Sequence, residues 1–499
     1  MTRKPRTARP VEVFEPGAAL SRRALGHVRR VLDPVAVAVF FLTVTLAALP
    51  MGGNRDWAWA PLCIVLGGVA VLVACGIGNR SGLPLAAAEK GPLLALGGCF
   101  AVFLAFALWQ MSPLAPRAGD AWLFDRAAAI LGTAQAPVPA VAADLARNSL
   151  LRCAACALAF LIARTLCRDV VYARWLLRML VASAILVVVY GILMQISTHS
   201  CYVGSYLKKQ FGYAPSDFCS MSGTFVNSNS FACYVGMAAT VLLALLFSGG
   251  DRASEDGDWE RHGGVLDWLN GRRVFQVALL LLLLGGLLLA ASRGGFAATA
   301  VGVLALAALM MRDRGRSQSD LGRAILIGVV VFLAIGLLAG GALVGKFKSA
   351  EQADGRLIIW AATLEAIGLS PWLGWGLGGY PDAYMIVQPA AMLQPNDLAH
   401  STPLEIVVEL GIVAAIPAFA LVVVPWLVCL NGALRRRLSH RYLPTAAFAG
   451  AAVAILHSMI DFSLQMPAIA LVVSALLGMG WAQAFSRRAS RPEDFTQAP

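Results

Sequence analysis

Charged side chains are scarce in this sequence. They make up 14% of its 499 residues, while hydrophobic residues make up 59%. Soluble globular domains carry about a quarter charged residues, so this composition excludes a chain that buries its apolar side chains in one aqueous core. The apolar residues instead form runs of about 17–25, the length of helix that crosses a roughly 30 Å hydrocarbon layer. We therefore expect an all-α polytopic membrane protein.

Several chemical signatures are also missing. No Cys/His cluster has metal-ligand spacing and no carboxylate pair stands out, so we expect no metal and no cofactor. The glycine-rich run PWLGWGLGGY at 371–380 lacks the Lys-Ser/Thr of a P-loop, which argues against a nucleotide site. No internal repeat or separate soluble domain is visible. Cys201 and Cys219 lie in a polar connection, where a disulfide and two free thiols are both open.

Hydropathy predicts twelve membrane spans. The seventh and eighth are separated only by residues 292–295, so a single broken helix is the alternative there. The tenth contains Pro417 and Pro425, which predict a kink or an unwound turn. The twelve spans are 35–50, 60–78, 91–111, 149–166, 175–196, 228–249, 274–290, 294–311, 323–345, 404–430, 443–460 and 466–485.

The basic residues predict the orientation of these spans. With the N-terminus inside and the spans alternating, 29 of the 40 Lys and Arg residues fall in inside segments and 11 fall outside. Cytoplasmic segments of membrane proteins are enriched in this way, so we expect both termini to be cytoplasmic. Because residues 1–34 are basic and polar, we expect an uncleaved first span with no cleavable signal peptide before it. The net charge of +12 is then explained by orientation, with membrane lipids and no nucleic acid as partners.

The chain divides into five parts on this interpretation. The largest external loop contains a stretch, 355–369, whose apolar residues recur at helical spacing, so we expect an amphipathic helix at the membrane interface. The parts are a cytoplasmic tail (1–34), spans one to nine (35–345), the external loop (346–403), spans ten to twelve (404–485) and a second cytoplasmic tail (486–499).

Polar residues gather at the mouth of the sixth span. The stretch GTFVNSNSFA at 223–232 contains Thr224, Asn227 and Asn229. Their hydroxyl and amide groups can hydrogen-bond to sugar hydroxyls or phosphate. Capping of the following helix by Asn or Ser is the alternative interpretation.

Two external arginines are candidates for binding phosphate. Arg293 lies in a Gly-Gly turn at a membrane boundary, where a charge is costly without a partner, and its guanidinium fits phosphate oxygens. Snorkelling to lipid headgroups is the alternative. Arg356 opens the amphipathic helix, where it can form a second phosphate contact. Trp375 and Tyr380, farther along the same loop, can stack on sugar rings or anchor the loop at the interface.

Two further stretches place ionisable groups at the outer ends of spans. His400 and Glu405 stand where the long loop enters the tenth span, and a histidine can take a proton near neutral pH. A structural role for His400 is the alternative. His457 lies within the eleventh span, where an ionisable group is a functional candidate, and Asp461 and Gln465 lie between the last two spans. We expect Asp461 to pair with Arg293 or Arg356, and we include Glu405, Asp461 and Gln465 among the substrate-binding candidates.

Together these stretches resemble the O-antigen ligase and polymerase superfamily of bacterial membrane glycosyltransferases. The resemblance covers about residues 220–470 and is carried by GTFVNSNSFA, SRGG, the DGR and PWLGWGLGGY segments, AHSTPLEIVVELG and HSMIDFSLQMPA. It implies a GT-C-like fold of about twelve helices in the bacterial inner membrane, with a large periplasmic loop. It also implies a glycan donor on undecaprenyl diphosphate, no metal, Arg293 and Arg356 as diphosphate binders, and His400 on the acceptor side.

The implied reaction is inverting transfer of the glycan to an acceptor hydroxyl. The pattern Asn-Ser-Asn-Ser at 227–230 together with HSMIDFSLQMPA looks closer to exopolysaccharide polymerases than to ligases that use lipid A-core as acceptor. The chain departs from the family pattern at Ser230 and Ser401, where many members carry other polar residues, and this departure concerns the acceptor geometry. The ligase remains the nearest alternative. A transporter or flippase is an alternative from another class, but transporters place polar groups near the midplane and often show repeats. A non-catalytic scaffold is a third.

Overall fold

The structure is a computed structural model of the chain. Every regular element among the residues that it describes is a helix. These residues are 32–77, 87–112, 114–115, 121–132, 143–198, 220–248, 271–312, 326–336, 349–390, 392, 396–435 and 438–486. Cys201, Cys219 and most of the two tails therefore lie outside the described residues.

Nine helices in the described ranges are long and apolar enough to cross a membrane. They are α2 (Asp56–Ala74), α3 (Ala87–Gln110), α5 (Ala143–Leu166), α6 (Val170–Thr198), α8 (Ser228–Ser248), α10 (Gly271–Ala290), α11 (Arg293–Met311), α15 (Thr402–Arg435) and α17 (Pro467–Phe485). This composition and the exposed side chains of Ile64 and Leu94, 77% and 76% accessible, are those of an integral membrane protein.

The remaining predicted spans also coincide with helices. Two are shorter apolar helices, Leu32–Leu46 and Leu326–Gly336, and the third is α16 (Leu438–His457). Each of the twelve predicted segments thus overlaps a helix, but nine of those helices have the length and hydropathy of a span. The count of twelve and the orientation of the helices remain predictions.

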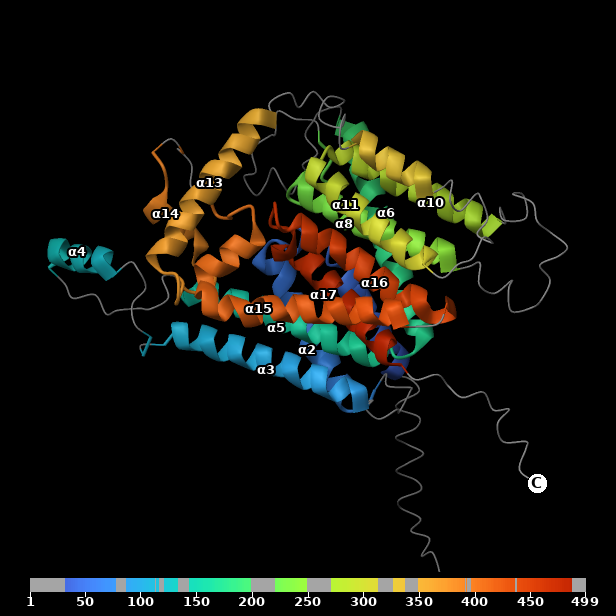
Figure 1. Cartoon of the computed structure of the whole chain (residues 1–499), viewed down its shortest axis with the longest axis horizontal. Helices are drawn as coiled ribbons and strands as arrows, with labels where there is room; N and C mark the ends of the chain where they lie inside the picture. Colours follow the sequence, from blue (N-terminus) through green and yellow to red (C-terminus); the bar gives the residue numbers. More distant parts are fainter. Residues whose placement is uncertain are drawn as a thin grey trace, which may run out of the picture.

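The seventh and eighth predicted spans are two separate helices, α10 and α11. Ala291 has a positive φ of 49°, and the Ser292 hydroxyl caps α11 by accepting the Gly295 N–H at 3.1 Å. The carbonyl of Leu289, at the end of α10, accepts the N–H of Met221, just before α8 begins. Both α10 and α11 pack along α8 (Figure 1). The chain therefore reverses between them, and the alternative of one broken helix is wrong.

Small residues bring the central helices close together. A Cβ at Gly302 of α11 would lie 2.5 Å from Val453 of α16, and one at Gly236 of α8 would collide with Thr299 of α11. Helices in lipid associate by such close packing because lipid tails give no hydrophobic drive for association. The buried centre of the bundle is therefore α8, α11, α16 and α17, and their ends are held in fixed positions relative to one another.

The long helix α15 is interrupted at Gly411. This glycine has φ 70° and ψ 169°, the one non-helical conformation inside α15. Pro417 and Pro425 lie inside the helix without such a break, so the unwound turn that we expected lies at Gly411 rather than at a proline. A Cβ on Gly411 would lie closer to the Trp372 carbonyl than van der Waals contact allows, which explains why the position is glycine.

The glycine-rich loop fills this interruption. The N–H groups of Trp375 and Gly376 donate to the carbonyls of Val408 and Glu409, both at 2.9 Å. The amide of Gln110, the last residue of α3, donates to the Glu409 carbonyl at 2.9 Å. The break is therefore level with the end of α3. Residues 402–410 extend about 13 Å past it, while residues 412–435 are about 36 Å long, enough for the hydrocarbon layer.

Two more helices pack around the extended start of α15. They are α13 (Ser349–Leu369), which contains the predicted helix 355–369, and the short α14 (Tyr380–Val387). Both stand at the left end of the bundle in Figure 1, as does α4 (Ala121–Leu131). Ile359 and Ala366 of α13 are buried against this group, while Leu357 and Leu364 are 60% and 57% exposed. The helix thus has two apolar faces, one buried and one exposed, whereas the expected amphipathic helix has a single apolar face.

Candidate functional site

The candidate site is built on the short connection between α16 and α17. Helix α16 ends at His457, and Pro467 opens α17. The residues between them fold into tight turns, in which Ile460 N–H donates to the His457 carbonyl and Gln465 N–H donates to the Phe462 carbonyl. The connection buries Asp461, which is 1% exposed. A buried carboxylate must be matched by donors or positive charge, since burial of a lone anion is very costly.

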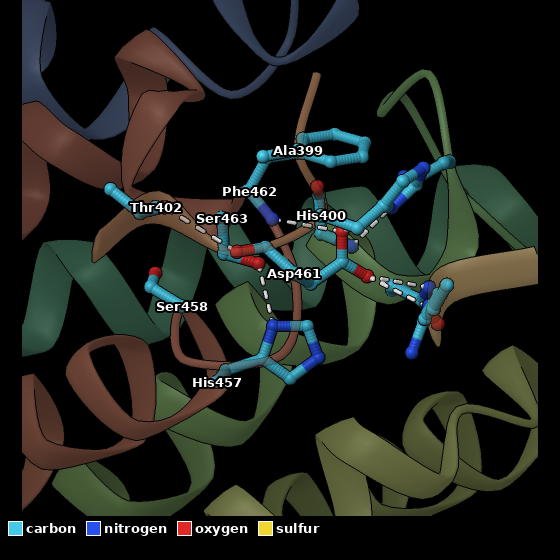
Figure 2. A network of polar contacts seen from close by, with 12 residues as sticks. Ala399, His400, Thr402, His457, Ser458, Asp461, Phe462 and Ser463 are labelled. Atoms are coloured by element: carbon cyan, nitrogen blue, oxygen red, sulfur yellow. Dashed lines mark hydrogen bonds and ion pairs between the residues drawn. The ribbon is translucent and has the colours of Figure 1, made fainter. Parts of the chain in front are cut away.

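Four groups surround the Asp461 carboxylate. The Asn229 amide donates to Oδ2 at 2.7 Å, and the Phe462 N–H donates to Oδ1 at 2.8 Å. The Arg356 guanidinium lies 3.5 Å from Oδ2. His400 Nδ1 lies 3.4 Å from Oδ1 (Figure 2). Helix α8, helix α13, the end of the long loop and the α16–α17 connection therefore meet at one carboxylate. We call this group of five residues the Asp461 cluster.

The cluster keeps Asp461 ionised. Burial by itself would raise the pKa of Asp461, but the contact with His400 and the charges of His457, His400 and Arg356 outweigh burial. They hold the pKa of Asp461 below the usual range of an aspartate. Asp461 is therefore an anion at neutral pH, placed between an arginine and an imidazole.

His400 has an unusual backbone conformation at the entrance of α15. Its φ is 50°, in the left-handed region that residues with a Cβ seldom adopt. Its ring packs against Phe462, with 5.1 Å between ring centroids, and its side chain is 30% exposed. The next turn is fixed by the Thr402 N–H, which donates to the Ser458 carbonyl at 2.9 Å. The imidazole thus has one nitrogen toward Asp461 and part of its ring accessible.

The two candidate arginines differ in their surroundings. Arg356 pairs with Asp461 and still has a side chain 35% exposed, so part of the guanidinium can contact a ligand. Arg293, the first residue of α11, is exposed and makes no ion pair or hydrogen bond with the described residues. Its neighbour Gly294 backs onto His457 and Ile460, since a Cβ there would lie 2.9–3.2 Å from them. Arg293 therefore stands beside the cluster without entering it.

Comparison with known families identifies the segment that carries these residues. Residues 278–419 match the family model described as O-antigen ligase. Over this segment the chain is similar to the O-antigen ligase family. No curated protein matches the chain.

The O-antigen ligase segment contains Arg293, Arg356 and His400 but ends before Asp461. Asn229 also lies outside it. The family match therefore covers the candidate arginines and the histidine, while the carboxylate that joins Arg356 to His400 comes from the following part of the chain. This match supports a glycan transfer of the O-antigen ligase type, from a lipid-linked glycan to a glycan acceptor.

Of the three polar residues predicted at the start of α8, one belongs to the cluster. Asn229 binds Asp461, whereas the Asn227 side-chain oxygen accepts the Ser230 N–H at 2.7 Å and so caps the helix. The Thr224 hydroxyl donates to the Ala48 carbonyl at 2.6 Å. Asn227 therefore has a local structural contact, so the capping alternative holds for it, and Thr224 joins the start of α8 to the N-terminal part of the chain.

Glu405 and Gln465 lie behind His400. Glu405 is 6% exposed, and its Oε2 accepts the N–H of Ala399 at 2.9 Å. The Gln465 amide also interacts with the Glu405 carboxylate. His457 is buried, with Nδ1 2.7 Å from the Ser463 hydroxyl (Figure 2). Glu405 thus supports the turn that carries His400, whereas His457 holds the connection between α16 and α17.

Trp375 and Tyr380 are packed inside the loop. Both are fully buried, and Trp375 Nε1 donates to the Ala366 carbonyl at 2.9 Å. The Tyr380 hydroxyl lies 3.0 Å from the Thr363 hydroxyl. Stacking of these rings on a sugar is not available in this structure, because no face of either ring is accessible. Trp372, by contrast, is 63% exposed.

Two residues of the site have no counterpart in the sequence-based expectations. Phe462 supplies an N–H to Asp461 and a ring to His400, and Trp360 donates from Nε1 to the Ala399 carbonyl at 3.0 Å. Trp360 lies one helical turn after Arg356, and this spacing was a signal that it shares the face of Arg356. In the described ranges no group of three or more His, Cys, Asp and Glu residues has the arrangement of a metal site.

Proposed function

We propose that this protein transfers a glycan from undecaprenyl diphosphate to an acceptor hydroxyl at the periplasmic face of a bacterial inner membrane, and that it extends a polysaccharide. Transfer inverts the anomeric carbon and needs no metal. The observation that carries the proposal is the Asp461 cluster, in which one buried carboxylate contacts both Arg356 and His400. The family match over 278–419 supports the reaction class.

Arg356 and Arg293 are suited to the leaving diphosphate. Both are at least partly accessible, and both stand at the same end of the bundle as Asp461. As the bond from the anomeric carbon to the diphosphate oxygen breaks, negative charge grows on that oxygen. Fixed guanidinium groups stabilise such charge, and their paired N–H groups fit phosphate oxygens.

His400 is suited to the acceptor. With Asp461 facing Nδ1, the imidazole is held in the orientation in which Nε2 is the free basic nitrogen. Nε2 then accepts the proton of the acceptor hydroxyl while that oxygen attacks the anomeric carbon from the side opposite the diphosphate. The products are the new glycosidic bond, undecaprenyl diphosphate and a protonated imidazole, whose charge Asp461 offsets.

A transfer assay in liposomes tests the proposal. Purified protein is supplied with an undecaprenyl-diphosphate-linked repeat unit, and products are separated by length. We expect polymer from the repeat unit alone, and we expect Arg293→Ala, Arg356→Ala and His400→Ala to lower the rate strongly while keeping the wild-type melting temperature within a few degrees. Full activity of Arg293→Ala and Arg356→Ala, in protein that remains folded, would contradict the proposal.

The same assay separates the polymerase from the ligase. A ligase needs lipid A-core as acceptor and yields one addition per acceptor, whereas a polymerase yields a ladder without it. A product that forms only when lipid A-core is present would assign the ligase activity. Movement of the donor between leaflets without a new glycosidic bond would assign transport.

A further inference from the structure

Ala399 immediately precedes His400, and both of its backbone polar groups are hydrogen-bonded to side chains. The Ala399 N–H donates to Glu405 Oε2 at 2.9 Å, and the Ala399 carbonyl accepts from Trp360 Nε1 at 3.0 Å. Ala399 itself is fully buried. Two side chains from different helices, α15 and α13, thus fix the peptide groups on either side of this residue.

These contacts explain how His400 keeps a conformation that is unfavourable by itself. A φ of 50° brings the Cβ of a non-glycine residue close to its own backbone, so the surrounding structure must impose it. Glu405 and Trp360 fix the chain before His400, and the bond from Thr402 N–H to the Ser458 carbonyl fixes it after. The imidazole is therefore aimed at Asp461 by its backbone, since its side-chain contact with Asp461 is long.

We propose that Trp360 and Glu405 are positioning residues for His400, and that Trp360 links the position of His400 to the helix that carries Arg356. The proposal rests on the function proposed above. Arg356 and Trp360 are four residues apart on α13 and therefore share a face. One helix thus contacts Asp461 through Arg356 and the His400 turn through Trp360. A donor diphosphate that binds Arg356 therefore contacts the same helix, α13, that positions the imidazole of His400 through Trp360.

Single substitutions separate this role from general stability. Trp360→Phe removes the N–H and keeps most of the ring. Trp426→Phe is the matched control, because Trp426 Nε1 also donates to a carbonyl, that of Phe448, at 3.0 Å within the bundle. Glu405→Leu removes the acceptor, and Glu405→Gln keeps an oxygen that can accept the Ala399 N–H.

We expect Trp360→Phe and Glu405→Leu to lower kcat about tenfold, with the donor KM changed less than about twofold. Glu405→Gln is expected to recover most of the kcat lost in Glu405→Leu. Trp426→Phe is expected to lower the melting temperature as much as Trp360→Phe does and to leave kcat unchanged. Equal kcat losses in Trp360→Phe and Trp426→Phe, or none in either, would overturn the proposal.

A measurement without turnover makes the inference independent of the assay. In ¹³C-histidine-labelled protein without donor, the ring resonance of His400 is assigned with His400→Gln. We expect this resonance to shift or broaden in Trp360→Phe and Glu405→Leu and to stay in place in Trp426→Phe. If the wild-type protein transfers no glycan, the proposed function fails, but the His400 resonance still tests the positioning role. An unmoved resonance in Trp360→Phe and Glu405→Leu refutes that role, and a shifted resonance supports it.

Discussion

The amide of Asn229 donates a 2.7 Å hydrogen bond to the carboxylate of Asp461, 232 residues farther along the chain. The bond joins the start of α8 to the connection between α16 and α17. Since Arg356 and His400 contact the same carboxylate, Asn229 helps to hold fixed the one group on which both depend. The predictions below follow from this arrangement.

Asp461→Asn is expected to lower kcat about 100-fold, because the amide cannot offset a protonated His400 or pair with Arg356. The measurement is polymer formation in liposomes. The control is Asp144→Asn, since Asp144 forms an exposed pair with Arg147 whose contribution is at most about 1 kcal/mol. Wild-type kcat in Asp461→Asn would refute the role of the carboxylate.

Arg293→Ala is expected to raise the donor KM at least about tenfold without lowering the melting temperature, since Arg293 is exposed and pairs with no described residue. The control is Arg147→Ala, whose side chain is 67% exposed and lies on α5. A KM for Arg293→Ala equal to that of Arg147→Ala would assign Arg293 to lipid headgroups, as in the snorkelling alternative.

The stability contribution of Asp461 is expected to be lost at acidic pH. The pKa of Asp461 is lower in the folded protein than in the unfolded chain, where an aspartate titrates near 3.9. The contribution is therefore fully present above about pH 4–5 and is lost as pH falls through the lower folded-state pKa. Thermal unfolding in detergent between pH 3 and 7 measures it. The melting temperatures of wild type and Asp461→Asn are expected to converge toward the acid end, and a constant difference across the range would refute this prediction.

Gly411→Ala is expected to destabilise the protein by at least about 2 kcal/mol and to abolish transfer. The new Cβ meets the Trp372 carbonyl, and the φ of 70° is itself unfavourable for alanine. The control is Gly97→Ala on α3, where a Cβ meets no atom within 4 Å. Thermal unfolding and yield of folded protein are the readouts. Equal stabilities for the two variants would show that the loop does not pack against α15 at this point.

Chelation is expected to leave the reaction rate unchanged. The proposed mechanism places the growing charge of the diphosphate on arginines, so no metal-assisted step is required. The measurement is polymer formation before and after extensive treatment with EDTA, with Mg²⁺ added back as the control. A loss of activity that Mg²⁺ restores would contradict the metal-independent mechanism.

The hydropathy pattern by itself determined the all-helical membrane architecture. Each predicted segment overlaps a helix because a run of some twenty apolar residues has one stable conformation in lipid, where every backbone group must be paired within the segment. The order of motifs likewise indicated the O-antigen ligase superfamily, with Arg293, Arg356 and His400 inside the matched segment.

The tertiary structure alone decided which polar residues meet. Asp461 pairs with Arg356 and not with Arg293, Asn227 caps a helix while Asn229 reaches the carboxylate, and Trp375 is buried. Such choices depend on how helices from distant parts of the chain are rotated and how far they extend. Hydropathy and motif spacing describe residues that are neighbours in the sequence, so they do not determine the rotation or the extent of distant helices. The contacts of Asp461, by contrast, join four separate segments of the chain.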